Sequence, residues 1–497
     1  MNGKALLAGL LALALVAPCA FADEPTPPGH DIPSDVTVLT IPFPANWFMP
    51  DPQYPQPYDA DEQWKIYGAK HMNPTAFPPI DIGLGLYDRG AYTPRPTFLG
   101  IKNPIMSALM IFGDLRIAGV NGTLQGNPVD QRRLAARLNL EGDWQFTPTE
   151  RVHALVRPLD TGGIASFYSF GGSPDKFTRE GNFGLKTLFF EGDLGSMYAG
   201  LTNKDNTFDR PIGFGRIPMF TQNGIWVDDP IDGVSIGLLT AKNSAKFDIS
   251  NFDIMAFVGL HNVASPALHA GDKSARVAAL TGFFDALGGY TEVGYGYFDD
   301  RDNSDLSYHN VTAAFSKRYH GKIANSVRVI GNFGQKANGA AKTADGVLLL
   351  VENSLVRGQY ANINPLTFVP YLNLFAGFKK PQPLARGADT GGVLKNTGIN
   401  FETDGMTGYP TLPAGANDTY GGALGLEYLF HLDRQIVMEL ARVQERNNSL
   451  PSAQTALGAR YQHPITNAWI VRFDAMKGWR PGLTNIYGAR VEIRRKF

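Results

Sequence analysis

The chain has 497 residues, of which 43% are hydrophobic, 11% are aromatic and only 18% are charged. About a quarter of the residues of a typical soluble protein are charged, so this composition is poor in charge. The 31 Phe, 19 Tyr and 6 Trp exclude a disordered chain, which lacks such apolar side chains. With 45 basic and 46 acidic residues, the chain lacks the positive charge that nucleic-acid binding needs, so no nucleic-acid partner is expected.

The first 22 residues show the features of a secretory signal peptide in their usual order. Lys4 gives a positive start, residues 5–16 form an apolar run, and Ala20 and Ala22 form a small-residue cleavage site. The alternative is a lipoprotein signal that ends at Cys19, the single cysteine. Cleavage after residue 22 predicts an exported chain without cysteine, and therefore without disulfides or a thiolate-bound metal.

Residues 23–104 hold nearly half of the 34 prolines, with aromatic residues such as Trp47, Tyr58 and Trp64 among them. Proline-rich backbone is extended or turn-rich, but simple linkers rarely carry aromatics. We expect this segment to thread the lumen of the protein, to close a periplasmic mouth or to bind a periplasmic partner. A partly ordered extension is the alternative.

No later stretch has the eighteen apolar residues of a membrane helix, but many stretches alternate apolar and polar residues with a period of two. In residues 485–497, Val491 and Ile493 alternate with Arg490 and Glu492. A soluble sandwich alternates too, but here many such stretches follow one another without helices. The pattern predicts about eighteen strands, with sixteen as the alternative. They are expected near 106–123, 133–146, 150–160, 183–193, 194–206, 232–245, 251–263, 275–286, 290–302, 306–320, 323–336, 345–359, 368–382, 419–432, 435–446, 453–465, 468–480 and 485–497.

The connections between these strands fall into two sets, one at each end of the strands. Counted from the C-terminus, one set is mostly short turns, and the other set contains the long loops. The long loops are 161–182, 207–231, 264–274, 337–344 and 383–418. Short turns on one side and long loops on the other are typical of a bacterial transmembrane β-barrel, which has an even number of antiparallel strands.

The signal peptide, the alternating strands and a last strand that ends in Phe497 resemble the porin-like β-barrels of the Gram-negative outer membrane. The resemblance covers residues 105–497 and implies an all-β antiparallel barrel in contact with outer-membrane lipid. It also implies that Phe497 is read by the barrel-assembly machinery, and that a homotrimer is possible. It identifies no subfamily.

The strand phases predict a polar inner face in which basic residues, mostly arginine, slightly outnumber acidic ones. Arginine suits carboxylate, phosphate and sugar hydroxyl groups, and fixed charges set ion preference in pores, so a weak anion preference is expected. A generic polar lining is the alternative, since any water-filled barrel needs one. The predicted pore-lining residues are Asp114, Arg116, Arg133, Arg137, Glu141, Asp143, His153, Arg157, Glu292, Arg328, Glu427, Arg460, Arg472, Asp474, Arg490, Glu492 and Arg494.

The third long loop narrows the pore in general porins, so the resemblance points to loop 207–231 as the constriction. Its candidate residues are Asp209, Arg210, Arg216, Asp228 and Asp229. Loop 383–418 is expected to be an external cap.

The sequence thus predicts a porin that passes small polar or anionic solutes by diffusion. The histidines form no metal-binding or catalytic motif, so no enzyme activity, metal or cofactor is expected. The alternative function is a barrel that acts as a sleeve or docking scaffold for a partner protein, such as a periplasmic electron carrier.

Overall fold

The structure is a computed structural model. It describes residues 78–83, 107–124, 127–161, 164–170, 176–181, 183–206, 208–268, 274–320, 322–355, 367–387, 392–398, 401, 405–431, 434–447, 451–466 and 468–497. The chain divides into the units Met1–Asp59 and Ala60–Phe497, and every described residue belongs to the second. The predicted signal peptide and all of segment 23–104 except residues 78–83 lie outside the described residues.

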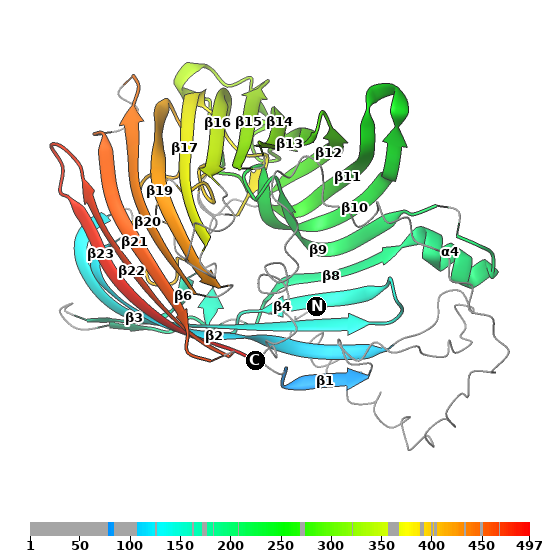
Figure 1. Cartoon of the computed structure of the whole chain (residues 1–497), viewed down its shortest axis with the longest axis horizontal. Coiled ribbons are helices and arrows are strands. Elements are labelled where there is room, and N and C mark those ends of the chain that lie inside the picture. The colour runs from blue at the N-terminus through cyan, green and yellow to red at the C-terminus, as the bar shows by residue number, and fades with distance from the viewer. Residues whose placement is uncertain are drawn as a thin grey trace. The chain divides into compact units, whose positions relative to one another are not determined.

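The described part of the chain is almost entirely β-strand (Figure 1). Besides the strands there are one α-helix, α4 (Leu194–Thr202), and three short 3-10 helices, at Ala245–Phe247, Ser304–Leu306 and Gly339–Ala341. The strands are β1 Ile80–Gly83, β2 Ala108–Leu124, β3 Asn127–Gln145, β4 Arg151–Val156, β5 Asp160–Thr161, β6 Ile164–Phe170, β7 Lys176–Thr178, β8 Leu185–Asp193, β9 Pro211–Thr221, β10 Val227–Ser244, β11 Ile249–Val263, β12 Ala275–Ala286, β13 Gly289–Asp299, β14 Tyr308–Tyr319, β15 Ile323–Phe333, β16 Asp345–Leu355, β17 Thr367–Lys380, β18 Ala385–Arg386, β19 Thr419–His431, β20 Arg434–Glu445, β21 Gln454–Pro464, β22 Trp469–Trp479 and β23 Ile486–Lys496.

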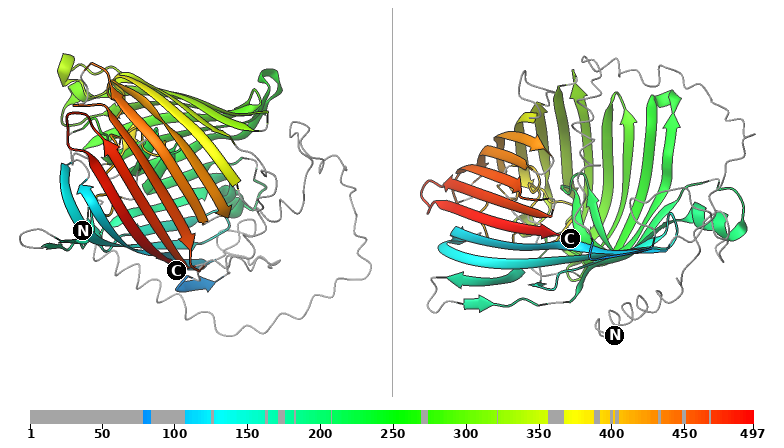
Figure 2. Two further views of the ribbon diagram at one scale, coloured as in Figure 1. Left: turned by 60° about the vertical axis from the view of Figure 1, so that its left-hand side comes forward. Right: turned by 60° about the horizontal axis from the view of Figure 1, so that its bottom comes forward.

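Eighteen of these strands form a closed antiparallel ring. Each of β2, β3, β4, β8 to β17 and β19 to β23 pairs with the next, and β23 pairs back onto β2. The two views of Figure 2 show the last strands, in red, beside the first barrel strands, in cyan. The predicted all-β barrel of about eighteen strands is therefore confirmed.

The alternation of the sequence explains which side of the wall each residue faces. On β23, Val491 and Ile493 are 43% and 45% exposed on the outer face, whereas Arg490 and Glu492 are each 1% exposed on the inner face. The same rule holds on β15, where Val327 and Val329 lie outside and Arg328 is buried inside. An apolar outside and a polar inside are the arrangement that a barrel needs to span a bilayer.

The ring closes at the ends of the chain's first and last barrel strands. Phe497 exchanges two backbone hydrogen bonds with Gly113 of β2, at 2.8 and 3.0 Å. Beyond the end of β23, β1 pairs with residues 108–111, along the edge of β2 that β23 also uses. Strand β1 therefore continues the line of β23. The described part of the proline-rich segment thus extends the barrel wall.

One predicted strand and one predicted loop are wrong. Residues 194–206 contain helix α4, and β9 lies inside the predicted loop 207–231. Leu194, Met197, Tyr198 and Leu201 follow the helical spacing of three and four residues, and the Asp193 carboxylate caps the helix by accepting the Ser196 N–H at 2.6 Å. No helix in the described part of the chain is long and apolar enough to cross a membrane.

The pairing of β2 with β3 depends on the absence of a side chain at residue 113. A Cβ atom on Gly113 would lie 2.0 Å from the backbone oxygen of Asn139, whereas one on Gly119 of the same strand would meet nothing within 4 Å. We expect Gly113→Ala to lower the free energy of unfolding by roughly 1–3 kcal/mol, because neighbouring backbone must move apart. Heat-modifiable migration in detergent gels measures this loss. The control Gly119→Ala should migrate as the natural protein does, and equal behaviour of both variants would contradict the expectation.

Candidate functional site: the barrel lumen

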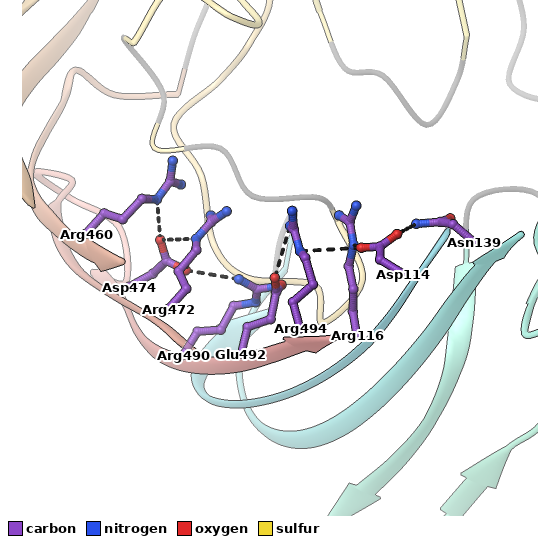
Figure 3. Close-up of polar contacts among 9 residues, drawn as sticks. All are labelled: Asp114, Arg116, Asn139, Arg460, Arg472, Asp474, Arg490, Glu492 and Arg494. Carbon is purple, nitrogen blue, oxygen red and sulfur yellow. Dashed lines mark hydrogen bonds and ion pairs between the residues drawn. The ribbon is translucent and has the colours of Figure 1, made fainter. Parts of the chain in front are cut away.

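A continuous row of charged side chains crosses the inner face of five neighbouring strands (Figure 3). It begins at Arg460 of β21, passes Arg472 and Asp474 of β22, and continues through β23. It ends at Asp114 and Arg116 of β2 and Asn139 of β3. These residues come from both ends of the barrel domain, and only the closure of the ring brings them together.

Asp474 is the centre of one end of this row. Its carboxylate accepts hydrogen bonds from Arg460 at 2.7 Å, Arg472 at 2.9 Å and Arg490 at 3.0 Å. The Asp474 side chain is 4% exposed and that of Arg490 is fully buried. A buried carboxylate with three guanidinium groups is held by charge-assisted hydrogen bonds from several sides.

The row continues along β23 to β2. Glu492 accepts hydrogen bonds from Arg490 and, at 3.1 Å, from Arg494. Arg494 lies 3.4 Å from Asp114, which also accepts hydrogen bonds from Arg116 and, at 2.5 Å, from Asn139.

Arg157, after β4, donates to the Asn139 side-chain oxygen at 3.1 Å. The row from Arg460 to Arg157 thus contains six arginines but only three carboxylates, those of Asp114, Asp474 and Glu492. Its net charge is therefore positive.

A second charged cluster lies at the turn side of β3, β4 and β8. His153 lies 3.4 Å from Asp143 and 3.1 Å from Glu191, and Arg151 reaches the same two carboxylates at 3.3 and 3.4 Å. Asp143 and His153 were predicted from the sequence, whereas Arg151 and Glu191 were not. Both lie on the face of their strands that the alternation assigns to the lumen.

The remaining predicted pore-lining residues lie on the inner face but outside the continuous row. Arg137 contacts the buried Asp160 at 2.7 Å. Arg328 of β15 contacts Glu352 of the neighbouring strand β16 at 3.0 Å. The guanidinium of Arg133 stacks on Phe167, 3.8 Å from the ring centre.

Three predicted acids complete the set. Glu141 is on β3 near the Asp114 end of the row, Glu427 is on β19, and Glu292 is on β13. The role of these residues in solute passage stays a prediction.

The predicted constriction residues do not form a loop. Asp209 and Arg210 lie in the connection between α4 and β9, Arg216 is on β9, and Asp228 and Asp229 are on β10. Arg216 shares a face of β9 with Phe214 and Phe220, which are 50% and 56% exposed, so it points outward, where it pairs with Asp232 at 2.7 Å. Asp229 is buried and accepts the Ala264 N–H at 2.8 Å.

The loop that does enter the lumen is the one between β17 and β19, which was expected to be an external cap. That expectation is wrong, because Leu384, Arg386, Leu394, Tyr409 and Leu412 of this loop are each at most 2% exposed. Strand β18 within it pairs in parallel with residues 227–228 of β10. The sequence reveals the length of this loop but not its docking place, which depends on contacts between strands far apart in the chain.

Several walls of the barrel hold this inward loop. Tyr308 of β14 donates to the Pro383 carbonyl at 3.2 Å, and Gln131 of β3 donates to the Gly408 carbonyl at 2.8 Å. The Tyr409 hydroxyl donates to the Gly488 carbonyl of β23 at 3.5 Å. Its apolar side chains join Trp226, Phe298 and Leu348 in one buried cluster, which also includes Ala456 of β21 and Met476 of β22. The loop therefore occupies part of the lumen and contacts the wall on several sides, including the strands of the charged row.

A cavity of about 270 Å³ remains between the inward loop and the charged wall. Arg460 and Asp474 line one part, Tyr409 lines the loop side, and Tyr371 and Glu439 line the rest. Tyr371 donates its hydroxyl hydrogen to the Glu439 carboxylate. Glu439 was not predicted, although it lies among apolar inner residues of β20 and the alternation places it inside.

No protein-family model matches the sequence, and no curated protein aligns with it. Solved structures do match the fold. OccK9 (OpdG) of Pseudomonas aeruginosa has a TM-score of 0.50 and 12% sequence identity, covering 78% of this chain and 98% of that chain. OccK5 (OpdH) of the same organism has a TM-score of 0.49 and 10% identity, covering 78% of this chain and 98% of that chain. Such low identity shows the fold alone.

The closed ring of eighteen strands, its apolar outside and its charged inside identify the class of protein. The chain has the fold of the porin-like β-barrels that it matches.

Proposed function

We propose that this barrel is a porin that passes small polar solutes by diffusion and favours anionic ones. The observation that carries the proposal is the arginine row beside the remaining cavity of the lumen. The side chains of Arg460, Arg494 and Arg116 keep 29%, 25% and 20% of their surface exposed. Guanidinium groups bind carboxylates and phosphates in two-point geometry, and fixed charges in a pore raise the concentration of counter-ions.

A generic lining is the weaker explanation, because a lining that only hydrates the pore needs no excess of one charge. Within the continuous row, arginines outnumber carboxylates. Glu141 and Glu427 lie near its two ends and Glu439 lines the cavity beside Arg460, so these three carboxylates offset the excess that the row has by itself. The expected preference for anions is therefore weak rather than absolute.

The alternative, a sleeve around a partner protein, is less well supported. A sleeve needs an open lumen, and the inward loop with Leu384, Leu394 and Leu412 occupies part of it. The homotrimer, the recognition of Phe497 by the barrel-assembly machinery and a periplasmic partner for segment 23–104 stay proposals.

Reversal potentials across planar bilayers with a salt gradient test the proposal. The full-length protein should form open channels with a modest preference for chloride over potassium. The triple variant Arg116→Gln, Arg460→Gln, Arg494→Gln should lose that preference, because it removes the three exposed charges of the row.

Arg442→Gln removes a charge from the outward face of β20 and is the matched control, which should keep the natural reversal potential. Clear cation selectivity of the natural protein would contradict the anion preference, and absence of any channel would contradict the porin itself.

A further inference from the structure

The outer face of the barrel carries a groove that the porin function does not use. It has a volume of about 940 Å³ and crosses the wall from β3 over β2, β23, β22 and β21 to β20. Its floor is a row of small residues that the strand register places side by side. Ala489 pairs with Ala475, and Ala475 pairs with Ala459, while Gly119 adds a further open position on β2.

Larger apolar side chains form the lower border of this groove. Val491 and Phe473 pair across β23 and β22, and Met438 ends the row of small residues on β20. These three side chains are 43%, 44% and 52% exposed. The groove is therefore an apolar depression in the surface that faces lipid.

The upper border of the groove is polar and basic. Lys477 pairs with Tyr487 across β22 and β23, and its ammonium group lies 5.5 Å from the centre of the tyrosine ring. Arg132 lies next to Asn121 on the same face and lines the groove. Among the described residues, neither Lys477 nor Arg132 forms an ion pair. Asp130 accepts the Tyr487 hydroxyl and offsets one of the two charges, so the border keeps a net positive charge.

The groove lies in the outer half of the membrane. Ala489 is three residues from the start of β23, and Ala475 is four residues from the end of β22, at the ends of these strands away from Phe497. In outer-membrane barrels the long loops face outward and the short turns face the periplasm. The basic border is nearer still to the outward ends, at the level of lipid head groups.

We propose that this groove binds an acyl chain of a phosphate-bearing lipid of the outer leaflet, with Lys477 and Arg132 contacting the phosphate. The apolar floor suits hydrocarbon, and the charge above it suits an anion at the depth where a head group begins. A second copy of the barrel is the other conceivable occupant. It would have to bring an acidic group to the basic border, whereas a phosphorylated lipid carries that charge by its own chemistry.

Native mass spectrometry of the full-length protein, incubated with diphosphoryl lipid A or with phosphatidylcholine, tests the site. The natural protein should retain lipid A and hold phosphatidylcholine more weakly. Lys477→Ala and Arg132→Ala should each weaken lipid A retention about fivefold, which is about 1 kcal/mol at 1.4 kcal/mol per factor of ten. The variant Ala475→Phe with Ala489→Phe should abolish retention, because the rings fill the floor.

Ala313→Phe places the same ring on the outward face of β14, away from the groove, and is the matched control that should bind lipid A as the natural protein does. Heat-modifiable migration of every variant separates lost binding from lost folding. Equal retention of lipid A by the groove-filling variant and by the natural protein would overturn the proposal. So would a dimer or trimer mass that the groove-filling variant abolishes while lipid retention is unchanged, since a second copy would then occupy the groove.

Discussion

Removal of the inward loop should raise the single-channel conductance, because that loop occupies part of the lumen. The loop can be removed at the ends of β17 and β19. Lys379 and Asp418 already face each other at the ends of β17 and β19, where the Asp418 N–H donates to the Lys379 carbonyl at 2.7 Å and the Lys379 N–H donates to the Asp418 carboxylate at 2.9 Å. A four-residue turn can therefore replace residues 381–417 without moving either strand.

The matched control shortens the connection 446–453, which joins β20 to β21 on the same side of the barrel. That variant should conduct like the natural protein. Heat-modifiable migration establishes that the loop-deleted barrel is folded before it is recorded. A folded, loop-deleted barrel with unchanged conductance would show that the loop does not limit the solute path.

Asp474→Asn should destabilise the barrel by about 3–5 kcal/mol, the usual effect of removing one partner from a buried ion pair. Three guanidinium groups, those of Arg460, Arg472 and Arg490, would then face one another without their shared carboxylate. The loss of a negative charge should also shift the reversal potential further toward anions. Chemical unfolding in detergent micelles, followed by tryptophan fluorescence, measures the first effect, and bilayer recordings measure the second.

Asp345→Asn provides the comparison, because Asp345 pairs with Lys379 at 3.2 Å at the surface. Exposed pairs contribute about 0–1 kcal/mol, so this variant should unfold almost like the natural protein. Adding Arg472→Gln to Asp474→Asn should recover part of the stability, since Arg472 pairs with Asp474, whereas Arg490 keeps its pair with Glu492. Equal stability of Asp474→Asn and Asp345→Asn would show that the arginine row does not stabilise the wall.

The strands of this barrel could be predicted because a wall between lipid and water imposes a period of two on every strand. Seventeen of the predicted strand positions correspond to strands of the ring, and the one at 194–206 does not. At 194–206 the spacing of apolar residues is helical. Strand β9 was missed because it contains Pro211, Gly213, Gly215 and Pro218, residue types that ordinarily mark loops. A barrel tolerates them because the neighbouring strands fix the backbone of β9 from both sides.

The lumen could be predicted in part for the same reason. Strand phase alone places Arg490, Glu492 and Asp474 inside, where they lie. It cannot show that the Arg490 side chain is fully buried while that of Arg460 is 29% exposed, because strand phase gives only the side of the wall. The docking of the loop depends on residues such as Asn223 and Gln131, which are 173 and 277 positions away from their partners in the loop.

This docking has a consequence for the order in which the molecule is built. The loop contacts Gln131, near the beginning of the barrel domain, and Gly488, in its last strand. Contacts between residues so distant in sequence form late, because a long chain must be closed before they are made. The loop can take its final place only after the first and last strands have met, so an unfinished barrel keeps an open interior, and the narrow passage is the last feature that assembly creates.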